Sequence, residues 1–152
     1  MEPALSLSIV RTRDWFGSRQ HILQAVLAFV VVNALLLVVM RFNGTEVLDQ
    51  LSYVRYDSGH YTGIATNGYD FFPCNPARYG PGRWCGNAAW FPGYPYLIRL
   101  LLPLTGGRPG VAGVLLSRLF LLGTLVVLAV VLKEHFGARR TLPILLAAAL
   151  FP

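Results

Sequence analysis

Apolar residues are concentrated in separate stretches of the chain, with polar, turn-rich segments between them. Residues 22–40 read ILQAVLAFVVVNALLLVVM, residues 110–132 form a second apolar stretch, and a third occupies residues 141–152. At a rise of 1.5 Å per residue, about 20 residues cross a hydrocarbon core roughly 30 Å thick. The first two stretches are predicted to be transmembrane helices, and the third to begin a further, truncated one. The predicted fold class is an all-α integral membrane protein, a fragment of a polytopic helical bundle.

The composition agrees with a lipid environment. Hydrophobic residues make up 55% of the 152 residues and charged residues 13%, whereas an ordinary soluble domain carries about 25% charged residues. A cleaved signal peptide is the alternative for residues 22–40. That stretch is long for the apolar part of a signal peptide, and no small-x-small cleavage site follows Met40. A retained signal anchor is therefore expected.

The net charge of +6 comes from scattered residues. The longest basic run is Arg139-Arg140. Charges of this kind are typical of membrane flanks rather than of a nucleic-acid surface. We expect no nucleic-acid partner, and a multi-pass protein of the cell membrane.

The charges before the first span predict its orientation. These charged residues are Arg11, Arg13, Arg19, Glu2 and Asp14. Positive flanks stay in the cytoplasm, so residues 1–21 are predicted to be cytoplasmic. Residues 41–87 then form a large extracytoplasmic first loop with short interfacial helices.

The loop contains the only two cysteines of the chain. Cys74 and Cys85 bracket NPARYGPGRW, in which prolines and glycines favour a tight turn. A pair of cysteines on an oxidising face predicts a disulfide, with two unpaired thiols as the alternative. Two thiols with His60 nearby are too few ligands for a metal site, so we expect no metal.

Residues 88–104 leave the topology open. They number 17, the lower limit for a span, and contain Arg99. If they cross the membrane, Arg99, Arg108 and Arg118 gather near the cytoplasmic side. If they dip in and return, the cytoplasmic residues are instead Lys133, Arg139 and Arg140.

The segment RYDSGHYTGIATNGYD, residues 55–70, predicts a short helix over residues 59–66. Asp57 or Ser58 can cap its start, and Asn67-Gly68 supplies a left-handed residue that ends it. Asp57, His60 and Tyr61 are spaced i, i+3 and i+4, so they share one face. The alternative is that Asp57 only caps the helix and that His60 is an ordinary interface residue.

Two segments together resemble the N-terminal part of the PIG-V-like mannosyltransferases, which belong to the GT-C class of membrane glycosyltransferases. The matching positions are Tyr56-Asp57, Tyr61, Ile64-Ala65, Gly68-Tyr69 and Trp90-Phe91-Pro92-Gly93-Tyr94-Pro95. Tyr56 stands where the family usually has tryptophan. The family uses eight or more spans, so the 152 residues resemble only its front part, from about residue 50.

The resemblance implies transfer of a sugar, mannose, from a polyprenyl-phosphate donor to a glycan or glycolipid acceptor, without a cofactor. The donor phosphate leaves as an anion, so one carboxylate base suffices to activate the acceptor hydroxyl. By resemblance, that base is Asp57. Arg55 and, more weakly, Arg99 are candidates to neutralise the lipid phosphate, and His60 and Tyr61 to bind substrate.

The resemblance also favours a crossing by residues 88–104. Two other hypotheses are a non-catalytic membrane subunit that partners a glycosyltransferase, and a piece of a transporter. The transporter is the weaker of the two, because the apolar stretches contain arginines but no acids.

Overall fold

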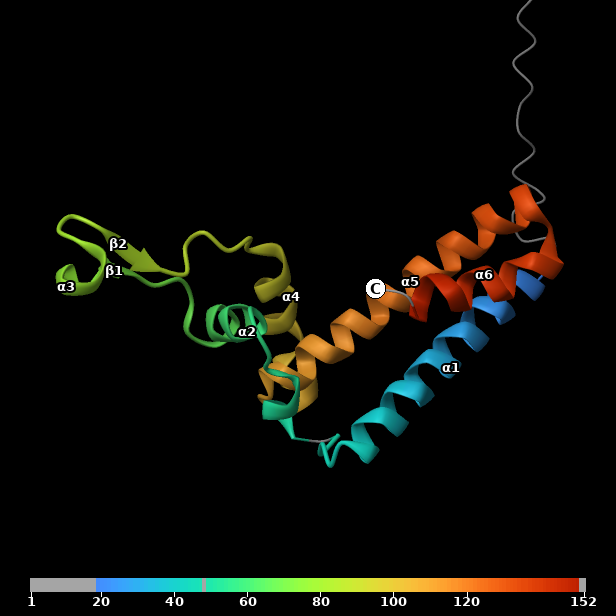
Figure 1. Ribbon diagram of the computed structural model, residues 1–152, viewed down its shortest axis with the longest axis horizontal. Coiled ribbons are helices and arrows are strands. Elements are labelled where there is room, and N and C mark those ends of the chain that lie inside the picture. Colours follow the sequence, from blue (N-terminus) through green and yellow to red (C-terminus); the bar gives the residue numbers. More distant parts are fainter. Residues whose placement is uncertain (1–18, 48, 151–152) are drawn as a thin grey trace, which may run out of the picture.

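The computed structural model describes residues 19–47 and 49–150 of the chain, and these residues are mostly helical (Figure 1). The elements, in chain order, are α1 (Gln20–Phe42), η2 (Gln50–Tyr53), α2 (Ser58–Asn67), β1 (Phe71–Pro73), α3 (Pro76–Tyr79), β2 (Trp84–Gly86), α4 (Gly93–Leu101), η3 (Leu102–Thr105), α5 (Pro109–Phe136) and α6 (Ala138–Leu150).

Two helices, α1 and α5, are the longest elements of the described residues. They contain 23 and 28 residues, which correspond to about 35 and 42 Å of helix. Both are long and apolar enough to cross a membrane. The predicted spans, residues 22–40 and 110–132, lie inside them. The structure therefore agrees with a helical chain that has two candidate membrane-spanning helices.

The two long helices pack antiparallel, with α6 against both. The first half of α1 supplies Ala25 and Ala28, and the second half of α5 supplies Leu125, Ala129 and Leu132. Small alanines let the helix backbones approach closely. Gly137, at φ 75°, ends α5 and reverses the chain, so α6 begins at Ala138, three residues before the predicted start.

A second packed region surrounds the opposite end of α5. There α2 and α4 contact each other and the first turns of α5, around a small core of Ala65, Ile98, Ala112 and Leu116. Figure 1 shows α2 and α4 beside this end of α5, away from α6.

The helix α4 is shorter than the predicted segment 88–104. It begins after Pro92 and contains nine residues, and Pro103 follows in η3. Nine residues reach roughly 14 Å, less than half of a hydrocarbon core. The helix α4 is therefore too short to cross a bilayer by itself, and α5 begins at the same end of the molecule (Figure 1).

A small antiparallel hairpin was not predicted. Phe72 of β1 pairs with Cys85 of β2, and the chain between the strands forms α3. Gly86 has φ 139°, and a Cβ atom there would lie 2.1 Å from the carbonyl oxygen of Asp70, so only glycine fits. The hairpin projects to one side of the line of α5 (Figure 1).

Candidate functional site

The turn before α2 is held by Ser58. Its Oγ accepts a hydrogen bond from the Arg55 N–H at 2.6 Å and donates to the Arg55 carbonyl oxygen. Within this turn, Tyr56 has φ 49°, the one positive φ among the described residues other than glycine. Left-handed backbone at a tyrosine is strained, and such strain is typical of functional sites. Asp57 follows directly after it.

Asp57 occupies the N-cap position of α2, but its side chain caps nothing in the described part of the chain. Its carbonyl oxygen accepts from the N–H groups of His60 and Tyr61, whereas its carboxylate makes no capping hydrogen bond. The side chain is exposed. Capping by the carboxylate, the alternative weighed from the sequence, is therefore not what the structure contains. The helix starts one residue before the predicted boundary and ends at Gly68, whose φ is 89°.

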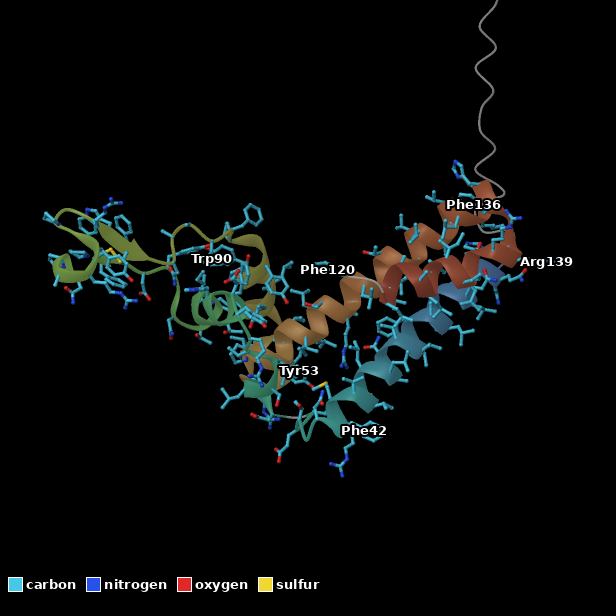
Figure 2. All side chains as sticks on the ribbon, viewed as in Figure 1. Phe42, Tyr53, Trp90, Phe120, Phe136 and Arg139 are labelled. Carbon is cyan, nitrogen blue, oxygen red and sulfur yellow. A yellow bond between two sulfur atoms is a disulfide. The ribbon has the colours of Figure 1, made fainter. Side chains whose placement is uncertain are left out.

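The structure brings the two predicted segments together through aromatic side chains. His60 of α2 stacks on Trp90, with ring centroids 4.8 Å apart and planes 15° apart. Tyr61 contacts Trp90 and Tyr94 edge-on, at centroid distances of 5.2 and 5.4 Å. Edge-on and stacked aromatic pairs of this kind stabilise a contact beyond the area they bury. Figure 2 shows Trp90 in the part of the molecule that contains α2 and α4.

Tyr69 fixes the backbone at Trp90. Its hydroxyl donates to the Trp90 carbonyl oxygen at 2.8 Å. Desolvation raises the pKa of the Tyr69 phenol above its usual 10.0, and the neighbouring Tyr96 and Tyr61 add to the rise. The phenol therefore stays protonated at neutral pH and remains a donor.

A small cavity lies next to this cluster, between α2, α4 and α5. Tyr94 bonds the Gly113 carbonyl oxygen at 2.9 Å and the Ser117 hydroxyl at 2.8 Å. A cavity of about 160 Å³ opens there, and Ser58, Thr62, Tyr94 and Ser117 contribute hydroxyls to its lining. Sequence reasoning missed Ser117. Its signal is a hydroxyl directly before Arg118 in an otherwise apolar stretch.

Of the two predicted arginines, Arg99 is not close to Asp57. Arg99 is exposed and lines a separate pocket of about 100 Å³ with Tyr69, Tyr96 and Gly68. Gly68 follows the last residue of α2 whereas Asp57 precedes the first, so Arg99 and Asp57 lie at opposite ends of a helix roughly 15 Å long. Arg55 is exposed two residues before Asp57.

The hairpin contains the cysteine pair. Cys74 and Cys85 are joined by a disulfide, visible as a yellow bond in Figure 2. Among the residues that the structure describes, no group of three or more His, Cys, Asp and Glu side chains lies close enough to hold a metal ion.

Comparison with protein-family models, with curated proteins and with solved structures found no match. The resemblance to mannosyltransferases remains a prediction from sequence motifs. The geometry around Asp57 is the physical basis for any functional proposal.

Proposed function

We propose that the chain is part of a membrane glycosyltransferase that transfers mannose from a polyprenyl-phosphate donor to an acceptor hydroxyl on the extracytoplasmic face. In this reaction Asp57 takes the proton of the acceptor hydroxyl. The acceptor oxygen forms a bond to the anomeric carbon of the donor sugar, and the bond from that carbon to the phosphate oxygen breaks. The electron pair leaves with the polyprenyl phosphate.

The surface of the long helices supports a place in the membrane. Large apolar side chains along α1 and α5 are exposed, including Leu35, Leu36, Val39, Leu119, Phe120 and Val127. A continuous apolar surface of this extent is unfavourable in water and suits a lipid environment.

Cations lie at both ends of the long helices. Arg41, in the last turn of α1, and Arg108, directly before α5, are at the end that holds Asp57. Arg19 precedes α1, and because α1 and α5 are antiparallel it lies at the same end as Lys133, Arg139 and Arg140. Figure 2 marks Phe136 and Arg139 at this end, and Trp90 and Tyr53 at the other. The proposed orientation rests on the charges that precede α1: if that flank stays in the cytoplasm, Asp57 and the aromatic cluster lie outside.

The observation that carries the proposal is the free carboxylate of Asp57. The carboxylate is exposed and makes no capping bond within the described residues. Asp57 follows the strained Tyr56 in the turn before α2, and α2 packs against the end of α5 where the headgroups would lie. A general base needs this combination of accessibility and fixed position. The neighbouring His60–Trp90 stack offers an aromatic surface for a sugar, and Arg55 a cation for the phosphate. Arg99 has no part in this site.

The test replaces Asp57 with asparagine in the protein expressed from its complete gene. Asparagine keeps the shape of the side chain but accepts no proton, so transfer of labelled mannose from polyprenyl-phosphate mannose in isolated membranes should fall about 10²–10⁴-fold. The amount of protein in the membrane should stay unchanged.

Asp49→Asn is the matched control. The Asp49 carboxylate caps η2 by accepting from the Leu51 N–H at 3.1 Å, and asparagine can make the same bond. This variant should transfer mannose at the unmodified rate. Near-normal transfer by Asp57→Asn would instead show that Asp57 is not the base and that the base lies elsewhere.

A further inference from the structure

The disulfide-closed hairpin, residues 71–86, exposes large aromatic side chains far from the proposed site. Phe71 and Trp84 stack with centroids 4.8 Å apart and planes 9° apart, yet 67% and 58% of their surfaces are exposed. Phe72 and Tyr79 are also about half exposed. Such a concentration of exposed aromatic surface on a short element indicates a contact surface.

Two arginines accompany these aromatic residues. Arg78 and Arg83 line an open hollow of about 490 Å³ together with Tyr79, Trp84 and the disulfide. The Arg78 guanidinium lies 5.4 Å from the centre of the Tyr79 ring. Residues 71–86 contain no acid, so the hairpin has a charge of +2. The hollow is therefore complementary to an anion, and guanidinium groups bind phosphate through paired hydrogen bonds.

The hairpin is braced and points sideways. The β1–β2 pairing and the disulfide hold its two strands together, and Asn75 caps α3 by accepting from the Ala77 N–H at 3.0 Å. Figure 1 shows it extending to one side of α5 rather than continuing the helix line. If α5 spans a bilayer, a hairpin displaced to the side of its first turns lies over the lipid beside the helices (Figure 1).

We infer that the hairpin docks on the outer membrane surface, with Phe71 and Trp84 in the interfacial layer and Arg78 and Arg83 on the phosphates of anionic phospholipids. Aromatic residues favour the interface, and arginines near an anionic surface add electrostatic attraction. The inference rests on the membrane placement proposed above, but not on sugar transfer. Docking would hold the long loop, and with it α2, close to the membrane surface.

Quenching of Trp84 fluorescence by brominated lipids tests the inference. The whole chain is reconstituted in vesicles of brominated phosphatidylcholine, with or without phosphatidylglycerol, and the signal of a Trp84→Phe variant is subtracted. Trp84 should be quenched, and more strongly with phosphatidylglycerol. Each arginine near an anionic surface raises the docking equilibrium constant about fivefold. The double variant Arg78→Gln with Arg83→Gln should therefore lower this constant roughly 25-fold.

The matched control removes two arginines from the other end of α5, by Arg139→Gln with Arg140→Gln, and should leave the Trp84 signal unchanged. The inference would be overturned if Trp84 were not quenched. It would also be overturned if the extent of quenching changed neither with phosphatidylglycerol nor with the removal of the hairpin arginines. Extraction by alkaline carbonate distinguishes a failure of the membrane placement from a failure of the hairpin docking. A chain that washes off contradicts the membrane placement as well, whereas a retained chain with unquenched Trp84 contradicts only the docking.

Discussion

Residues with similar capping potential behave differently in this chain. Asp49 and Asn75 both occupy N-cap positions with extended backbone, and their side chains accept from the N–H two residues on. Asp57 has helical backbone at its N-cap position and makes no such bond among the described residues. The Ser58 hydroxyl bonds the preceding turn instead. A carboxylate without a structural task is available for chemistry.

This difference predicts how stability responds to asparagine and alanine. Asp57→Asn and Asp57→Ala should be equally stable, since both remove the charge and neither loses a cap bond. Asp49→Asn should be more stable than Asp49→Ala by about 1 kcal/mol, because only asparagine preserves the cap. Hydrogen exchange measured by mass spectrometry over η2 and α2 checks both pairs. Faster exchange of α2 in Asp57→Ala than in Asp57→Asn would show that the carboxylate caps the helix after all.

At the scale of elements, Gly113 lies at the contact between α4 and α5. A Cβ atom at Gly113 would lie 3.4 Å from the Tyr94 hydroxyl and 3.5 Å from Ile98 Cδ1. A Cβ would therefore be in ordinary contact with these atoms, and a larger branched side chain would press against the Tyr94 hydroxyl beside the cavity. The position of α4 thus depends on a residue of another helix.

We predict that Gly113→Val separates the two helices. The branched side chain overpacks the contact, which should destabilise the fold by about 1–3 kcal/mol and lower the thermal midpoint in detergent. Gly123→Val on the same helix is the control, because a Cβ there meets no described atom within 4 Å. Equal midpoints for the two variants would contradict the α4–α5 packing.

At the scale of the whole molecule, the two ends of α5 have different chemistry. One end carries the site, its aromatic cluster and the hairpin. The other carries the α1–α5–α6 core with Lys133, Arg139 and Arg140. Among the described residues, α1 and α5 are the helices long and apolar enough to cross a bilayer, whereas α4 is too short. We take these two helices as the crossings. All of the loop between them then lies on one face.

This arrangement makes a topology prediction with two probes. In a chain with Cys74→Ser and Cys85→Ser, a single cysteine at Ser52 should react with a membrane-impermeant thiol reagent in intact cells. A single cysteine at Arg139, exposed at the other end, should react only after permeabilisation. Reaction at both positions in intact cells would mean that residues 88–104 cross the membrane.

The sequence by itself determined the features that depend on neighbouring residues. Long apolar runs predicted α1 and α5 to within a few residues. A helix makes its backbone hydrogen bonds within its own segment, so its formation needs no partner. The Asn67-Gly68 pair indicated the end of α2, because glycine adopts positive φ without strain. The prediction of a short helix after Asp57 likewise depended only on neighbouring residues.

Only the tertiary structure decided which of these local features meet. The stacking of His60 on Trp90 and the bond from Tyr94 to Ser117 join residues 30 and 23 positions apart, and no periodicity in either segment encodes such a pairing. Nor did the sequence indicate that Arg99 and Asp57 lie at opposite ends of α2, or that α4 packs against α5. These features depend on side-chain shape at helix contacts, such as that of Tyr94 and Ile98 with the backbone at Gly113. Packing of this kind is a property of two surfaces together, so neither segment of sequence specifies it alone.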